Sequence, residues 1–355
     1  MKQCPGLFLF CRSGYEKDCA AEIQAIANRL AYTGYCKTTP ESGYVTFFTT
    51  DFQTAKSLYS AIDFSQLLFA RQWFLIFSYL DDLPEKDRLK PIMESIEQMT
   101  NFYSPLNQLV IQQANMEGKD NLQRFITSFS HPLRNALDQQ NIITESQQHQ
   151  ENFLQLCFTS AKQVYIGYLP KGNHWPGGIP RLKIPETAPS RSYLKLEEAF
   201  VRFTSNNRSH YLQPQMTATD LGAAPGGWSW LLIQNHLKVT AVDNGPLNPK
   251  LLESGLCKHV MHDAFRYDPG YPNDWLICDI VDKPMRVMDL INHWLEHRWC
   301  QYTIFNLKLP MQQRYKFIEQ EVYPWLESLQ QDQLISRWKG KHLYHDRHEV
   351  TFMLE

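Results

Sequence analysis

Five short β-rich runs recur between residues 216 and 308, and stretches with helical periodicity separate them. This alternation is typical of a parallel sheet built from βαβ units. The runs are MTATD (216–220), KVTAVD (238–243), KHVMHD (258–263), DWLICD (274–279) and TIFNLK (303–308). Because parallel strands end on the same edge of a sheet, and ligands of open α/β sheets bind at that edge, the pattern predicts both a fold class and the place of a site.

Charged residues close all five runs. Four of the runs end in aspartate, at Asp220, Asp243, Asp263 and Asp279, and the fifth ends in Lys308. A single aspartate at such a place is usually a helix N-cap, and a single lysine usually extends from a strand end into solvent. Four aspartates joined by a lysine at one sheet edge instead predict one polar site.

The first run continues as DLGAAPGGWSWLL, in which Gly222, Gly226 and Gly227 permit a tight turn and a close approach of the backbone to a ligand. The spacing differs from the GxGxxG pattern of dinucleotide-binding proteins. Asp243 lies 23 positions after Asp220, near the roughly 20 at which an acid binds ribose hydroxyls. The sequence therefore predicts an adenosyl ligand, and both NAD and S-adenosylmethionine contain that half.

Three further residues extend the predicted site. Asp263 is placed to accept a hydrogen bond from an adenine amino group. Glu349 opens the terminal run HEVTFMLE, and an antiparallel strand there would begin on the edge where the others end. Lys195, in the amphipathic segment SYLKLEEAF, could reach this edge as well, although a solvated helix lysine is an equally ordinary interpretation.

The rest of the chain divides by composition. Residues 1–82 alternate strand and helix as a small α+β unit that ends in the linker-like DDLPEKDR, and residues 83–170 form a second α+β unit. A loop rich in Gly and Pro follows, so the third domain is predicted over 171–355.

Overall composition excludes several protein classes. The formal net charge of −2 gives no global positive field for nucleic acid, so a basic surface must be local. The segment 337–348 is one candidate, because Arg337, Lys339, Lys341 and Arg347 alternate there with Trp338 and Tyr344. Eight cysteines without a CxxC pair favour buried thiols in a cytoplasmic protein and no metal site. No apolar run reaches the roughly eighteen residues of a membrane span.

Several motifs carry a family resemblance. SRSYLKLEEAF, DLGAAPGGWS, CDIVDKP, FNLKLP and DRHEVTF together resemble the ribosomal RNA 2′-O-ribose methyltransferases with a Lys, Asp, Lys, Glu tetrad. With SGYEKDCAAEI, LLFARQWF, GIPRLK, AVDNGP and LYHDRHEVT, the whole chain is similar to the RlmM family of large-subunit ribosomal RNA cytidine 2′-O-methyltransferases. One departure is Ala224, where close relatives carry cysteine.

The resemblance implies a ferredoxin-like domain over 1–82, a THUMP RNA-binding domain over 83–170, and a Rossmann-like α/β methyltransferase domain over 171–355. It implies S-adenosyl-L-methionine as cofactor, 23S ribosomal RNA as partner and a monomeric chain. Lys308 is the expected general base, assisted by Lys195, Asp279 and Glu349. The expected cofactor contacts are Ser192, Ala224, Pro225, Gly226, Gly227, Asp243, Asp263 and Asp279. Ser192 is also a candidate helix N-cap.

Other functions were weighed against this one. Methyltransferases of exocyclic base amines usually carry Asn or Asp, Pro, Pro and an aromatic residue where this chain has DIVDKP, and C5 methylation needs a nucleophilic cysteine, whereas Cys278 lies in an apolar strand. A nicotinamide dehydrogenase would share the adenosyl half but leaves Lys308 and Glu349 unexplained. An RNA-binding module with an inactive catalytic domain would not need the tetrad.

Overall fold

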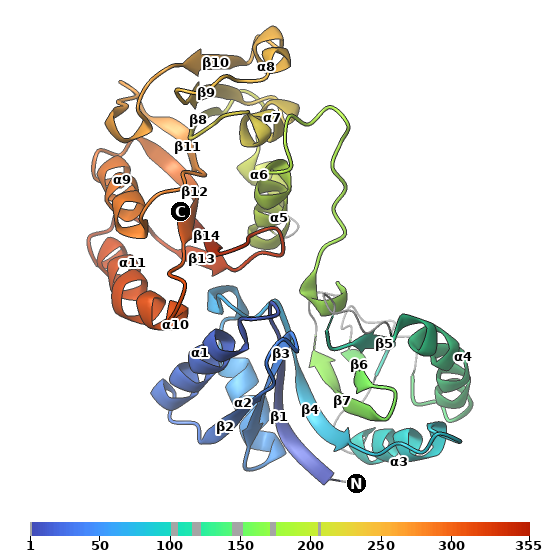
Figure 1. Cartoon of the computed structure of the whole chain (residues 1–355). Coiled ribbons are helices and arrows are strands. Elements are labelled where there is room, and N and C mark those ends of the chain that lie inside the picture. Colours follow the sequence, from blue (N-terminus) through green and yellow to red (C-terminus); the bar gives the residue numbers. More distant parts are fainter. Residues whose placement is uncertain (1, 101–105, 116–121, 144–151, 171–174, 205–206) are drawn as a thin grey trace. The chain divides into compact units, whose positions relative to one another are not determined.

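A computed structural model describes residues 2–100, 106–115, 122–143, 152–170, 175–204 and 207–355. The chain forms two compact units, Met1–Pro180 and Arg181–Glu355 (Figure 1).

One seven-stranded sheet organises the first unit, with strand order β2-β3-β1-β4-β7-β6-β5. Its strands are β1 (Lys2–Phe10), β2 (Gly34–Thr38), β3 (Tyr44–Thr49), β4 (Gln72–Leu80), β5 (Gln108–Gln113), β6 (Asn152–Ser160) and β7 (Gln163–Pro170). Its helices are α1 (Glu16–Arg29), α2 (Phe52–Ala61), α3 (Leu89–Thr100) and α4 (Gln123–Gln139), with 3-10 turns η1 (Phe64–Gln66) and η2 (Pro176–Gly178). The consecutive strands β6 and β7 pair antiparallel.

The two α+β units expected before residue 171 share this sheet. β4 from the first pairs antiparallel with β7 from the second, with Leu75 opposite Tyr168. A boundary at residue 82 therefore divides the sequence inside one continuous hydrogen-bonded sheet.

The second unit contains the predicted parallel sheet, in the order β10-β9-β8-β11-β12-β14-β13. Its strands are β8 (Thr217–Leu221), β9 (Lys238–Val242), β10 (Cys257–Val260), β11 (Asn273–Cys278), β12 (Cys300–Lys308), β13 (Trp338–Lys341) and β14 (Glu349–Leu354). The strands from β8 to β12 are mutually parallel, and β14 runs antiparallel to β12 with Lys308 opposite Glu349. The α/β fold class is confirmed, and Glu349 begins on the edge where β12 ends.

Helices cover both faces of this sheet, with α5 and α7 on one face and α9 and α11 on the other (Figure 1). The helices are α5 (Tyr193–Phe203), α6 (Arg208–Tyr211), α7 (Gly227–Gln234), α8 (Pro249–Glu253), α9 (Pro284–Glu296), α10 (Arg314–Phe317) and α11 (Tyr323–Gln331), with η4 (Ala264–Arg266) and the π-helical η5 (Ile318–Val322). Since both faces are covered, the central strand β11 is apolar throughout its Trp275–Cys278 segment and buried there.

The strand order places a topological switch point between β8 and β11, because the chain leaves β8 toward β9 and later returns on the other side of β8 to form β11. This is where ligands of doubly wound sheets bind. All eight cysteines are free thiols. Within the described ranges, no cluster of metal-ligating side chains is found, and no helix has the length and apolarity to cross a bilayer.

Candidate active site

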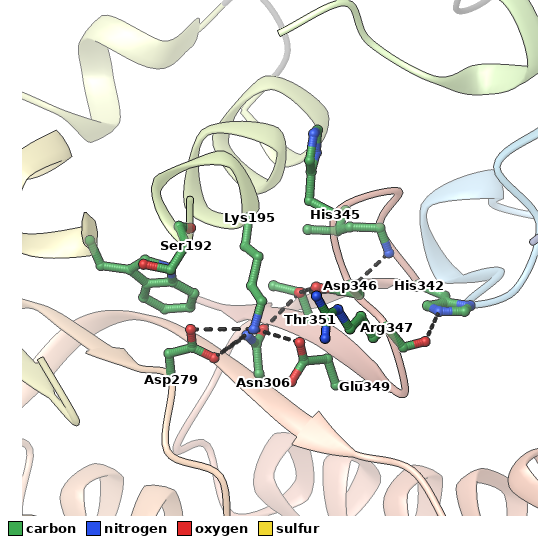
Figure 2. A network of polar contacts seen from close by, with 12 residues as sticks. Ser192, Lys195, Asp279, Asn306, His342, His345, Asp346, Arg347, Glu349 and Thr351 are labelled. Atoms are coloured by element: carbon green, nitrogen blue, oxygen red, sulfur yellow. Dashed lines mark hydrogen bonds and ion pairs between the residues drawn. The ribbon is translucent and has the colours of Figure 1, made fainter. Parts of the chain in front are cut away.

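Lys195 brings three elements together at the switch-point edge. It lies in the first turn of α5, whose opposite face buries Leu196 and Phe200 in the core. Its Nζ lies 3.1 Å from Oδ1 of Asp279, which follows β11, and 2.5 Å from Oε1 of Glu349, the first residue of β14. Figure 2 shows the ammonium between the two carboxylates. The three side chains are only 15–18% exposed.

Electrostatics fix the charge of this lysine. Burial lowers the pKa of Lys195, but the carboxylates of Asp279 and Glu349 outweigh it and raise the pKa above that of a free lysine. Burial raises the pKa of Asp279, and Lys195 opposes that rise. In this arrangement Lys195 is a permanent cation near neutral pH and cannot accept a proton.

Lys308 has a different environment. It ends β12 beside Glu349 and is exposed. It lines a pocket of about 530 Å³ together with Lys195 and Glu349, so three of the four predicted catalytic residues share one cavity. The remaining lining residues are Arg191, Ser192, Leu194, Val281, His345, Arg347 and His348.

The glycine turn between β8 and α7 packs against the start of α5. Gly222 and Gly226 adopt φ of +78° and +110°, a region that glycine enters at little cost. A Cβ on Gly227 would lie 2.3 Å from Oγ of Ser192, so only glycine allows this approach. The Ser192 hydroxyl does not cap α5 and instead forms a 2.6 Å hydrogen bond with Ser190. Ser192 therefore occupies the predicted N-cap position of α5, but its side chain does not cap the helix.

Asp243 follows β9 and braces the turn. Its Oδ2 accepts a hydrogen bond from the Ala224 amide at 3.0 Å, and its Oδ1 accepts one from the Gly245 amide at 2.7 Å. Each oxygen keeps lone-pair capacity for a further donor. Asp263 is exposed and caps η4 through the Phe265 amide at 3.0 Å. Pro225, between Ala224 and Gly226, is exposed.

The chemistry of these residues is suited to an adenosyl cofactor. The half-buried Asp243 carboxylate offers acceptors for ribose hydroxyls. At Gly227 the turn carries no side chain and passes close to Ser192, which itself lines the pocket containing Lys308. Of the expected cofactor contacts, Ser192 lines that pocket and Asp279 forms an ion pair with Lys195. Ala224, Gly226 and Gly227 lie in the turn whose backbone is hydrogen-bonded to Asp243.

Asp220 lies inside β8 rather than after it. It is 1% exposed and accepts a 2.6 Å hydrogen bond from the Ser229 hydroxyl of α7. Burial raises its pKa to about 7. Its role in this structure is to join α7 to the sheet.

A buried glutamate attaches the loop 342–348 to α5. Glu198 accepts hydrogen bonds from the amides of Tyr344 (3.0 Å) and His345 (3.1 Å), from Nδ1 of His345 (2.8 Å) and from Nε of Arg202 (2.9 Å). Burial alone would raise the pKa of Glu198, but His345 and Arg202 lower it to about 2. The Glu198 carboxylate therefore holds this loop, with its pocket-lining residues His345, Arg347 and His348, against α5.

Three polar residues behind the site were missed by the sequence analysis. Asn306 donates a 2.7 Å hydrogen bond from Nδ2 to Oδ1 of Asp279, and its Oδ1 accepts one from Thr351 at 2.7 Å. Thr351 also lies 3.0 Å from Oδ2 of Asp346. A period-two signal was available, because Asn306 and Thr351 lie two residues from Lys308 and Glu349 and therefore on the same sheet face.

The predicted phosphate-contact segment is partly wrong. Lys341 is 3% exposed. Lys339 donates to the Phe203 carbonyl and lies 3.6 Å from Glu355, and Arg337 pairs with Glu355 too. Arg337 and Lys339 therefore bind the terminal residue Glu355. Arg347, by contrast, is exposed and lines the pocket.

Comparison with known proteins gives three family matches along the chain. The RlmM ferredoxin-like domain matches residues 4–74, the N-terminal model of ribosomal RNA large subunit methyltransferase M matches 87–169, and the FtsJ-like methyltransferase model matches 188–297.

Full-length relatives agree. A protein of Cellvibrio japonicus named ribosomal RNA large subunit methyltransferase M is 42% identical over 348 residues, with 97% of each chain covered. One of Shewanella pealeana with the same name is 40% identical over 354 residues, covering 98% of this chain and 97% of the relative. Among solved structures, TrmN from Thermus thermophilus overlaps with a TM-score of 0.35 at 12% identity over 99% of both chains.

With this identity over nearly the full length of both relatives, the chain belongs to the ribosomal RNA large subunit methyltransferase M family and is an S-adenosylmethionine-dependent methyltransferase of ribosomal RNA.

Proposed function

We propose that this enzyme methylates the ribose 2′-hydroxyl of a cytidine in 23S ribosomal RNA and that Lys308 is the general base. S-adenosylmethionine, when bound, supplies a sulfonium methyl group that an oxygen nucleophile attacks in line. A ribose hydroxyl is a weak nucleophile until its proton is removed, so a base is needed at that oxygen.

The assignment of the general base depends on a difference between Lys195 and Lys308 in their ion pairs. Lys195 is held as an ammonium by two carboxylates. Lys308, in the part of the chain that the structure describes, forms no ion pair and opens into the pocket. Of the two amines, only that of Lys308 is free to approach a ribose.

A lysine base must be neutral when it acts, although its ordinary pKa is about 10.4. Binding of the nucleotide would remove water from the Lys308 amine in a pocket that it shares with the Lys195 ammonium. Asp279 and Glu349 hold Lys195 in place for this purpose. After the methyl transfer, the exposed position of Lys308 lets its ammonium return the proton to solvent.

The cofactor contacts form the other half of the proposal. We assign the ribose hydroxyls of the adenosyl group to Asp243, its base to Asp263, and its methionine part to Ser192, Asp279 and the turn from Ala224 to Gly227. Support comes from the hydrogen-bonded carboxylate of Asp243 and from the close approach of Gly227 to Ser192.

RNA docking is assigned to the N-terminal regions, with a ferredoxin-like domain over 1–82, a THUMP domain over 83–170 and the catalytic domain over 171–355. The family matches over 4–74 and 87–169 support the first two. We further propose that the enzyme acts as a monomer in the cytoplasm.

The test is methyl transfer to 23S ribosomal RNA isolated from cells that lack the protein, followed by nucleoside mass spectrometry. We expect 2′-O-methylcytidine. A methyl group on a base, or transfer only to another RNA, would overturn the proposed acceptor.

The base is tested by Lys308→Ala. We expect a loss on the order of 10³-fold in methyl transfer, with S-adenosylmethionine affinity by calorimetry retained. Lys238→Ala is the matched control, because Lys238 is an exposed lysine that begins β9 at the opposite edge of the same sheet. Equal activity of the two variants would remove Lys308 from this role.

A further inference from the structure

Asp346 is a third carboxylate behind the paired Lys195, and the reaction described above leaves it without a role. It belongs to the loop between β13 and β14 and is 0% exposed. Its Oδ2 accepts a hydrogen bond from the Leu343 amide at 3.0 Å, and both its oxygens lie near the Thr351 hydroxyl, at 3.2 and 3.0 Å. Figure 2 shows Asp346, Thr351 and Asn306 in line behind Asp279.

Hydrogen-bond directions in this row can be counted. Asp279 receives two donors on Oδ1, the Lys195 ammonium at 3.1 Å and Nδ2 of Asn306 at 2.7 Å. The opposite amide orientation would set the Asn306 oxygen against the Asp279 carboxylate, acceptor against acceptor. The oxygen of Asn306 must therefore face Thr351, where it can only accept.

Thr351 has one proton and two neighbours that need it. Its hydroxyl lies 2.7 Å from Oδ1 of Asn306 and 3.0 Å from Oδ2 of Asp346. Because the Asn306 oxygen has no proton to give, the hydroxyl must donate to it. The contact between Thr351 and Asp346 is then a hydrogen bond only if Asp346 supplies the proton.

We propose that Asp346 acts as a neutral carboxylic acid that donates to Thr351, and that the row from Asp346 through Thr351 and Asn306 orients Asp279 against Lys195. Asp346 is thus a positioning residue. Its catalytic meaning rests on the proposed function, whereas its protonation does not.

The charges around Asp346 agree with a neutral form. Glu349 and Lys195 face it from β14 and α5, and Glu198 faces it from α5 as well. Asp279 and Glu349 already outnumber Lys195, so an ionised Asp346 would place a third carboxylate charge in the same cluster at a fully buried position, which is costly. Burial first, and Glu349 second, raise the pKa of Asp346 well above its ordinary value.

Protonation is measured by infrared difference spectroscopy of the full chain at pH 7. We expect a carboxylic-acid C=O band in the wild type that disappears in Asp346→Asn. Asp220→Asn is the control, because Asp220 is the other buried aspartate with a raised pKa, and it should leave the Asp346 band in place. A wild-type spectrum in which Asp346→Asn removes no acid band overturns the proposal, whatever the enzyme methylates.

Activity tests the positioning role. Asp346→Ala and Thr351→Val should each lower kcat on the order of 10- to 100-fold, with the affinity for S-adenosylmethionine kept. Asp346→Asn should restore most of the activity that Asp346→Ala loses, since a carboxamide can donate to Thr351 and accept from Leu343. Thr351→Ser should likewise rescue Thr351→Val.

An Asp346→Asn variant as inactive as Asp346→Ala would show that a negative charge is needed, and would overturn the inference. If Lys308→Ala instead keeps full activity while the acid band of Asp346 is present, only the assignment of Lys308 as the base is overturned.

Discussion

The two halves of the sheet edge use their carboxylates differently. On the side of β8, β9 and η4, Asp243 and Asp263 accept hydrogen bonds from backbone amides: Asp243 from Gly245 and from Ala224 in the turn after β8, and Asp263 from Phe265. On the side of β11, β12 and β14, Asp279 and Glu349 bind the side chain of Lys195, which arrives from a helix 84 residues earlier than Asp279. The first half uses backbone donors at most 19 residues away in the chain, whereas the second joins side chains that are 84 residues apart.

The comparison also separates two buried aspartates. Asp220 accepts a hydrogen bond from the Ser229 hydroxyl, and burial raises its pKa to about 7. The side chain of Asp279 is 16% exposed and lies 3.1 Å from the Lys195 ammonium. Two aspartates of the neighbouring strands β8 and β11 therefore differ: Asp220, inside β8, has a pKa near neutral pH, and Asp279, after β11, is part of an ion pair.

The largest expected effect is a pH-dependent change in the free energy of unfolding when Asp220 is replaced. Because the folded pKa of Asp220 is raised, the folded state binds its proton more tightly than the unfolded state, and stability is lost as pH rises from about 4 to about 7. Asp220→Asn stays neutral throughout. Its free energy of unfolding in urea, relative to wild type, should rise by up to about 4 kcal/mol across this window. Parallel pH curves for the two proteins would contradict the raised pKa.

A smaller loss is expected from Lys195→Met, which leaves the two carboxylates of Asp279 and Glu349 without their cation. The free energy of unfolding should fall by about 3 kcal/mol, and methyl transfer should fall with it. Lys308→Ala is the matched control for stability, because its exposed side chain should change the free energy by less than about 0.5 kcal/mol. Equal stability of the two variants would show that the Lys195 pair contributes little.

The smallest effect concerns the cofactor side. Gly227→Ala places a Cβ 2.3 Å from Oγ of Ser192, so either the turn or α5 must shift, at a cost of about 2 kcal/mol. We expect weaker S-adenosylmethionine binding by calorimetry with the Lys195 pairing intact. Gly270→Ala is the control, since its φ of +70° adds backbone strain but a Cβ there meets nothing within 4 Å. Unchanged affinity of Gly227→Ala for S-adenosylmethionine would show that the turn does not contact the cofactor.

The parallel strands of the second sheet, the approximate ends of these strands and the sheet edge that carries the charged residues were predictable from the sequence. Each of these follows from a local pattern, such as an apolar run that ends in a charged residue, or a terminal strand whose first residue is Glu349. The register that places Lys308 opposite Glu349 agrees with this expectation. The break expected at residue 82 does not mark a separate sheet, because hydrogen bonding between β4 and β7 is a long-range contact that leaves no local signal.

By itself, the sequence determined which residues reach one edge of the second sheet, because period and chain direction fix where each strand ends. Only the tertiary structure decided what each residue does there. Lys195 is a fixed cation and Lys341 a buried one, while Lys308 remains exposed. The physical reason is that charge state and accessibility depend on distances between segments far apart in the chain, and those distances exist only in the folded protein.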